Sequence, residues 1–216
     1  FLASIFRIFG HNYFSVRTVQ AVLGALTCVT IYLTALCLFD KKVALIAGLL
    51  GAVNISFIKS SENLLTEALS TFLISLLVFF LIRLKNGRNL RWGFLVGALS
   101  GILALTRSET VFFLPFICGV WLLLIYLKRP SFRLSVKGCI VSLIIFMSIV
   151  LLWSYRNWRI YHAFVPITTT VGMNLYSSYC PPQGKLFGFT ANDEIAQLSR
   201  KMGNEVEQSR FLVNAT

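Results

Sequence analysis

The sequence predicts an all-α fold, a polytopic transmembrane helix bundle with about six spanning helices. Hydrophobic residues make up 56% of the 216 residues, charged residues make up 13%, and the mean hydropathy is +0.76. A soluble domain usually carries about a quarter charged residues. The charges are also segregated, because six apolar stretches contain only Arg17 and Glu67, each within a turn of the start of its stretch. The stretches are 16–39, 43–58, 64–82, 92–106, 110–127 and 138–153.

A short amphipathic segment precedes the first spanning stretch. Helical spacing places five of its apolar side chains on one face, which is typical of a helix lying in the membrane interface. These side chains are Phe1, Leu2, Ile5, Phe6 and Phe9. We expect Gly10 and Asn12 to end this helix, and Ser15 to cap the first spanning helix.

Two stretches, 43–58 and 92–106, are short for a hydrocarbon core that takes about 20 helical residues. Each stretch carries small residues at four-residue spacing, and such faces let two helices approach closely. The small residues are Ala44, Gly48 and Ala52 in one stretch and Gly93, Gly97 and Gly101 in the other. We interpret both faces as helix-packing surfaces rather than ligand sites.

The basic residues indicate which side of the membrane each connection occupies. Ten of the 20 Lys and Arg residues fall in connections 40–42, 83–91 and 128–137, all on one side if every stretch crosses. The positive-inside rule makes this side cytoplasmic. The net charge of +12 therefore anchors topology and faces anionic lipid, and no basic stretch with interleaved aromatics indicates nucleic-acid binding. We expect a multi-pass protein of a bacterial or archaeal cell membrane.

The region after residue 153 then lies outside. Segment 163–190, rich in Thr, Gly, Pro and Tyr, predicts a long outer loop, and long ordered loops are commonly functional. Asn192 is expected to cap an amphipathic helix. The apolar face of that helix comprises Ile195, Leu198, Met202 and Val206. The predicted domains are an interfacial helix over 1–15, part of a larger membrane domain over 16–158, and an extracytoplasmic loop and helix over 159–216. Because the chain opens on Phe1 and stops within a helical pattern, we interpret it as a fragment.

Cysteines and histidines predict no metal or disulfide chemistry. Four of the five cysteines lie inside apolar stretches, where a thiol behaves as a small hydrophobe, and Cys180 is alone in an outer connection. No Cys/His spacing resembles a zinc site, and no residue is assigned as a metal ligand. No fingerprint for a nucleotide or redox cofactor is present. The sequence assigns no cofactor.

The outer ends of the predicted helices collect cations and carboxylates together. These residues are Arg17, Lys59, Glu62, Glu67, Arg107, Glu109, Arg156 and Arg159. A phosphate leaving group needs cationic or hydrogen-bonding partners in the transition state, and a hydroxyl acceptor needs a carboxylate base. The same outer surface could supply both.

Each of these residues also has a structural explanation. Glu67 and Glu109 are expected in the first turns of outer-starting helices, and Arg107 at the end of an outward-running helix, where such charges complement the helix dipole. Arg156 can anchor to headgroups beside the aromatic belt over 153–161. The opposite charges packed into turn 106–109 favour a functional role there. Pro115 is expected to kink helix 110–127.

Six short motifs occur in order along the chain and carry a family resemblance. They are 17–26 (RTVQAVLGAL), 65–68 (LTEA), 105–109 (LTRSE), 156–158 (RNW), 164–169 (FVPITT) and 172–176 (GMNLY). Together they resemble the protein O-mannosyltransferase-like branch of the GT-C membrane glycosyltransferases, which also holds the aminoarabinose transferases acting on lipid A. The resemblance covers nearly the whole chain.

The resemblance implies an enzyme that passes a sugar from a polyprenyl-phosphate carrier to an extracytoplasmic acceptor, which is a lipid, a glycan or a protein. By motif, Arg107 and Arg156 would bind the donor phosphate, with Lys59 a further candidate on position. Glu67 and Glu109 would line the same cavity and orient the cations, the acceptor or a metal. Asn174 and Tyr176 would offer polar contacts to sugar.

Two departures from the family pattern bear on catalysis and specificity. The family's key acidic residue is expected in a first outer loop, which would precede Phe1, so the catalytic residue is unknown within this chain. After Tyr176, residues 177–182 (SSYCPP) replace the usual Gly, Asn and Pro residues. Two other function classes remain alternatives, a polytopic transporter and a non-catalytic membrane subunit that binds polyprenyl lipids. Transporters usually place ionisable groups near the midplane within internal repeats, and neither feature is evident here.

Overall fold

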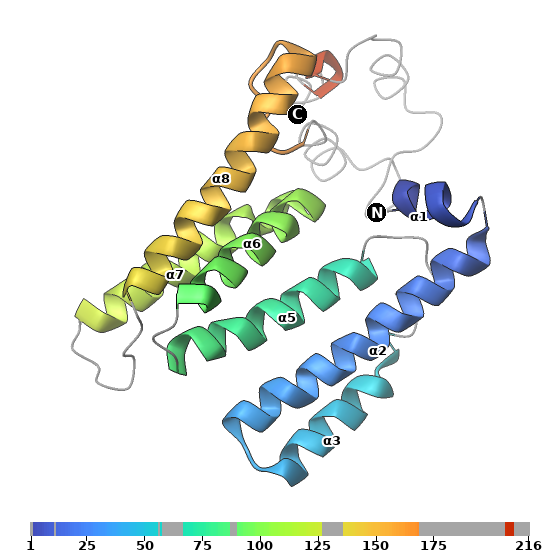
Figure 1. The fold of residues 1–216 in the computed structure, drawn as a ribbon, viewed down its shortest axis with the longest axis vertical. Helices are drawn as coiled ribbons and strands as arrows, with labels where there is room; N and C mark the ends of the chain where they lie inside the picture. Colours follow the sequence, from blue (N-terminus) through green and yellow to red (C-terminus); the bar gives the residue numbers. More distant parts are fainter. Residues whose placement is uncertain are drawn as a thin grey trace, which may run out of the picture. The chain divides into compact units, whose positions relative to one another are not determined.

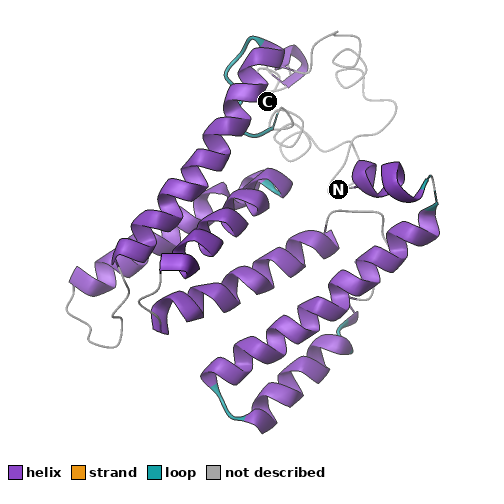
Figure 2. Cartoon of the chain, viewed as in Figure 1, coloured by secondary structure: helices purple, strands orange, loops and turns teal. Residues whose placement is uncertain are grey.

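The structure is a computed structural model that describes residues 2–10, 12–55, 57, 67–86, 90–126, 136–168 and 206–209. Within this part of the chain every regular element is helical, and no strand is present (Figure 2). The all-α fold class is therefore confirmed for the described residues. The chain divides into two compact units, Phe1–Ile149 and Val150–Thr216, which are described separately below.

Helices α1 (Leu2–Phe9) and α2 (Tyr13–Leu38) begin the first unit. Gly10 ends α1 with a φ of +74°, a left-handed conformation that glycine adopts without steric cost. Asn12 caps α2, since its side-chain oxygen accepts a hydrogen bond from the Phe14 amide at 2.9 Å. The prediction that Ser15 caps this helix is wrong, because α2 begins two residues earlier and Ser15 lies inside its first turn.

Three described helices are long and apolar enough to cross a membrane, namely α2, α5 (Glu67–Asn86) and α8 (Val136–Tyr161). The protein is therefore an integral membrane protein. Three further apolar helices are shorter, α3 (Lys41–Ala52), α6 (Leu90–Thr106) and α7 (Phe113–Tyr126). At 1.5 Å per residue the 12-residue α3 spans about 18 Å, against a hydrocarbon core of about 30 Å. The sequence predicts about six spanning helices, and three described helices are long enough to cross the hydrocarbon core.

Helix α3 folds back along α2 and packs on it through small residues. A Cβ added at Gly48 would lie 3.2 Å from the Tyr32 Cβ, and one added at Gly51 would lie 3.7 Å from the Cys28 sulfur. Because the later residue of α3 faces the earlier residue of α2, the two helices are antiparallel. Ala44 is fully buried, whereas Ala52 is exposed. Gly51 therefore packs against α2, where the four-residue spacing predicts Ala52. The helix also ends at Ala52, well before residue 58.

Helix α5 lies beside α2 and runs in the same direction (Figure 1). The hydroxyl groups of Thr30 and Ser75 share a hydrogen bond of 3.0 Å between the two helices. Helix α6 then returns against α5, and the ring centroids of Phe80 and Trp92 lie 5.6 Å apart near this reversal. Helices α5 and α6 are therefore antiparallel.

The glycines of α6 form its contact with the first half of α8. A Cβ added at Gly93 would lie 2.6 Å from the Gly138 carbonyl oxygen, one at Gly97 would meet the Ser142 carbonyl oxygen, and one at Gly101 would lie 2.8 Å from the Ile149 side chain. Since both series of residue numbers rise together, α6 and α8 run parallel. The glycine spacing in α6 is thus confirmed as a helix-packing surface, because a side chain at these positions would push the helices apart.

These directions bring several helix ends of the first unit to one end of its bundle. The starts of α2 and α5 lie there with the ends of α3 and α6. We call this end the Arg107 end, after the residue that directly follows α6. Lys41 and Lys42 lie at the opposite end, where α3 begins.

Candidate functional site

The turn after α6 carries an arginine and a glutamate side by side. The amide of Arg107 donates to the Leu103 carbonyl at 2.8 Å, and its own carbonyl accepts from the Thr110 amide at 3.0 Å and the Thr110 hydroxyl at 2.7 Å. This extended residue links α6 to the 3₁₀ helix η1 (Ser108–Phe112). Backbone hydrogen bonds on both sides therefore fix the position from which the Arg107 side chain leaves the turn.

The side chains of this turn form an open ion pair. The Arg107 Nε lies 3.7 Å from a Glu109 carboxylate oxygen, and the two side chains are 43% and 71% exposed. An exposed pair of this kind contributes at most about 1 kcal/mol to stability. The predicted proximity of the two charges is therefore observed, and both groups remain accessible to a ligand from solvent.

The elements after this turn differ from the prediction in two respects. Glu109 lies in the first turn of the 3₁₀ helix η1, and not at the start of an α-helix. Pro115 is the third residue of α7, where a proline requires no intrahelical amide donor. The prediction of a kink in the interior of helix 110–127 is therefore wrong, because the α-helix starts only at Phe113 and Pro115 lies in its first turn.

Glu67 begins α5 at about the same level of the bundle as Arg107. It stands 13 residues before Phe80, and Thr106 stands 14 residues after Trp92, whose ring lies beside that of Phe80. With equal rise per residue, the start of α5 and the end of α6 lie at matching heights. The Glu67 side chain is exposed, and within the described part of the chain its carboxylate has no hydrogen bond or ion pair. Its backbone carbonyl accepts from Ser70 and Thr71.

Arg156 belongs to the second unit, where α8 continues to Tyr161 instead of ending near residue 153. Its guanidinium carbon lies 4.7 Å from the Trp153 ring centroid, a cation–π contact. One guanidinium nitrogen also donates to the Asn157 side-chain oxygen at 3.2 Å. The side chain is nevertheless exposed. Arg156 is thus oriented by two neighbours while most of its donors still face solvent.

Three side chains of α8 hold the segment that follows the helix. The Asn157 amide group donates to the carbonyls of Val165 at 3.1 Å and Ile167 at 3.4 Å. The Trp153 indole donates to the same Ile167 carbonyl at 3.2 Å. The Ser154 hydroxyl lies 2.8 Å from the Pro166 carbonyl. Three successive carbonyls, 165 to 167, are therefore fixed to the end of α8.

The sequence interpretation assigned no role to Trp153, Ser154 or Asn157 in this junction. Ser154 and Asn157 are buried, at 7% and 3% exposure. Two polar side chains three residues apart face the same side of a helix, a spacing that could have indicated a partner there. The partner could not have been named from the sequence, because it is a set of backbone carbonyls beyond the helix end.

Several predicted site residues lie outside the described residues. These are Lys59, Glu62, Asn174 and Tyr176, together with the expected helix start at Asn192. The structure thus brings Arg107 and Glu109 together, places Glu67 at a matching height in the same unit, and gives Arg156 its own surroundings in the second unit. Among the described residues no three His, Cys, Asp or Glu side chains gather as a metal site.

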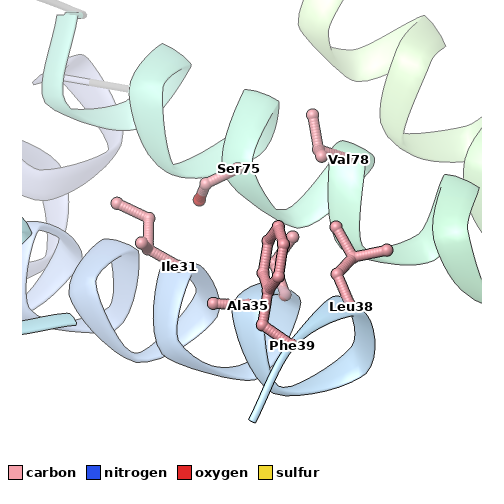
Figure 3. A pocket seen from close by; sticks show the side chains of 7 residues that line it. Ile31, Ala35, Leu38, Phe39, Ser75 and Val78 are labelled. Carbon is pink, nitrogen blue, oxygen red and sulfur yellow. The ribbon is translucent and has the colours of Figure 1, made fainter. Parts of the chain in front are cut away.

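An apolar groove of about 320 Å³ lies between α2 and α5, away from the Arg107 end (Figure 3). Its lining residues are Ile31, Thr34, Ala35, Leu38, Phe39, Ser75 and Val78. The lining contains two hydroxyl groups and no charged side chain. This groove therefore suits an apolar chain and lacks the cations that a phosphate would need.

The sequence model of the family described as dolichyl-phosphate-mannose-protein mannosyltransferase matches residues 1–153. This range covers most of the chain, including all elements of the first unit. No curated protein and no solved structure matches the chain.

Proposed function

Because the chain belongs to the dolichyl-phosphate-mannose-protein mannosyltransferase family, and is a membrane glycosyltransferase of the GT-C type, we propose that it transfers a sugar from a polyprenyl-phosphate carrier. The acceptor is a hydroxyl group on the extracytoplasmic side of the membrane. The observation that carries this proposal is the exposed Arg107 guanidinium, fixed at its backbone and held 3.7 Å from an exposed carboxylate. A cation in this setting suits the phosphate of a lipid-linked donor.

The proposed reaction exchanges one bond to the sugar for another. The bond between the anomeric carbon and the donor phosphate oxygen breaks, and a bond from that carbon to the acceptor oxygen forms. The acceptor proton passes to a carboxylate base, and the polyprenyl phosphate leaves with the electron pair of the broken bond. Negative charge therefore grows on the phosphate as the bond breaks, and a fixed cation there lowers the barrier.

In this proposal the cations bind the donor phosphate and the carboxylates orient them. Arg107 and Arg156 are the proposed phosphate ligands, because arginine presents several donors in a planar fork that matches phosphate oxygens. Lys59 is proposed on its sequence position alone. Glu67 and Glu109 orient the cations, the acceptor or a divalent metal ion, and Asn174 and Tyr176 contact sugar.

The family also weighs against the two alternative classes. Membership of a glycosyltransferase family favours sugar transfer over transport and over passive lipid binding. The apolar segments support this choice, because their only two charges, Arg17 and Glu67, lie near segment starts and not at the midplane. Mannose is the first sugar to test, because the name of the family includes it.

The proposal is tested with membranes that contain the complete protein. Labelled mannose is supplied either on a polyprenyl phosphate or on a nucleotide, with membranes lacking the protein as control. We expect protein-dependent transfer of label to endogenous acceptors from the lipid-linked donor only. Transfer from the nucleotide sugar alone, or no transfer from either donor, contradicts the proposed donor class.

A further inference from the structure

Asn157 joins two parts of the second unit through one buried side chain. Its amide nitrogen donates to the Val165 and Ile167 carbonyls, and its amide oxygen accepts from Arg156 at 3.2 Å. The residue is only 3% exposed. A buried amide needs partners for its donors and its acceptor, and here both ends have them. The side chain therefore belongs to a connected network and does not act as a headgroup anchor.

The partners also fix which way the amide points. Carbonyl oxygens can only accept, and a guanidinium can only donate. The amino group of Asn157 must therefore face the segment 165–167, and its oxygen must face Arg156. A reversed amide would set an oxygen against two carbonyls and an amino group against a cation. The orientation of this side chain thus follows from chemistry at both ends.

Trp153 makes a second connection between Arg156 and the segment 165–167. Its ring lies under the Arg156 guanidinium at 4.7 Å, and its indole nitrogen donates to the Ile167 carbonyl at 3.2 Å. Each of the two side chains that orient Arg156 therefore also holds the segment after the helix. Movement of this segment would disturb both contacts of the guanidinium together.

We propose that Asn157 is a positioning residue that sets the Arg156 guanidinium for the donor phosphate and ties that guanidinium to the segment 165–167. This inference rests on the proposed function, in which Arg156 binds the phosphate. Asn157 itself touches no substrate. One guanidinium nitrogen is engaged by Asn157, and the exposed side chain keeps its other donors for phosphate oxygens.

The test is a double-mutant cycle in the complete membrane protein, with N157A, R156A and both changes combined. The KM for a polyprenyl-phosphate sugar and kcat are measured per amount of folded protein. If Asn157 acts through Arg156, N157A raises the donor KM about tenfold in the wild-type background and less than about twofold in the R156A background. If Asn157 only stabilised the fold, its effect on the donor KM would be the same with and without Arg156. The fold-changes of the two single variants would then multiply in the double variant.

Two further variants keep the test informative. S148A removes a side-chain hydrogen bond to the Ile144 carbonyl two turns before Arg156 in α8, outside the junction, and it is expected to leave the donor KM unchanged. N157S is smaller than the wild-type residue and buries no charge, so it serves if N157A fails to fold. It loses the oxygen beside Arg156 and both amide donors to the segment, so the same dependence on Arg156 is expected.

The outcomes separate the inference from the proposed function. An active wild-type protein with equal effects of N157A or N157S in both backgrounds overturns the inference alone. An active wild-type protein that R156A leaves unchanged also overturns it. A folded wild-type protein that transfers no sugar from the lipid-linked donor overturns the proposed function, and the inference falls with it.

Discussion

The Arg107 Nε and a Glu109 carboxylate oxygen lie 3.7 Å apart in a turn where both side chains are open to solvent. The distance is too long for a direct hydrogen bond, and the exposure keeps the pair weak. Folding therefore gains little from holding these charges together. A ligand with a phosphate and hydroxyl groups could engage both without breaking a strong interaction.

Replacing Glu109 by Gln tests whether the carboxylate orients the arginine. E109Q removes the negative charge beside Arg107 but keeps the guanidinium, so we expect transfer from a polyprenyl-phosphate sugar to fall by about tenfold. Stability should change by less than about 1 kcal/mol, because the pair is exposed. Initial transfer rates and thermal unfolding in detergent measure the two effects. A loss of several kcal/mol in stability would contradict the interpretation of this pair as functional.

Glycine 97 is expected to be required for the contact of α6 with α8. In Gly97→Ala the new Cβ would meet the Ser142 carbonyl oxygen and lie 2.9 Å from the Ser142 Cα, so the helices must separate. We expect a loss of about 1–3 kcal/mol, measured as a lower unfolding temperature in detergent.

Gly119→Ala is the matched control, since a Cβ added there meets nothing within 4 Å. Alanine favours helix over glycine by about 1 kcal/mol, so this control should be neutral or stabilising. Equal destabilisation by both substitutions would show that the α6–α8 contact is not as close as described.

Asn12 and Ser15 provide a second matched pair, at the start of α2. Only Asn12 accepts a hydrogen bond from the Phe14 amide in the described structure. We expect Asn12→Ala to cost about 1 kcal/mol and Ser15→Ala to cost less than about 0.5 kcal/mol, as measured by thermal unfolding. A larger loss of stability from Ser15→Ala than from Asn12→Ala would indicate that Ser15 caps the helix.

The sequence predicted the helices well where apolar length decides them, and less well at their ends. Helices α2, α5 and α8 fall on three of the predicted stretches. The prediction stopped the last of them at residue 153, because apolar composition ends there, yet α8 continues to Tyr161. Hydropathy measures where a chain meets lipid, and a helix can extend past that boundary through aromatic and basic residues.

Helix packing was predictable in kind but not in partner. The glycine spacing in α6 indicated a close approach, and the structure supplies α8 as the helix that approaches it. Small residues permit contact with any surface of suitable shape, so their spacing names no partner. In α3 the packing residue is Gly51 rather than Ala52, because the helix turns a different side toward α2 than four-residue spacing implies.

The candidate site was predictable only where its charges are close in sequence. Arg107 and Glu109 are two residues apart, so their pairing followed from the turn itself. Asn157 lies within the motif 156–158, but the sequence does not predict its role, because its partners at Val165 and Ile167 are set by the path of the chain after α8. Backbone carbonyls carry no residue-specific signal, so such a junction is visible only in three dimensions.

The most direct test of the account compares the wild-type protein with R107A in membranes supplied with a polyprenyl-phosphate-linked sugar. K41A is the control, because it removes a cation at the opposite end of the bundle. With equal amounts of protein in the membrane, we expect R107A to lower transfer by about 100-fold or more and K41A to leave it unchanged. Wild-type rates of transfer in R107A would contradict the assignment of the donor phosphate to this turn.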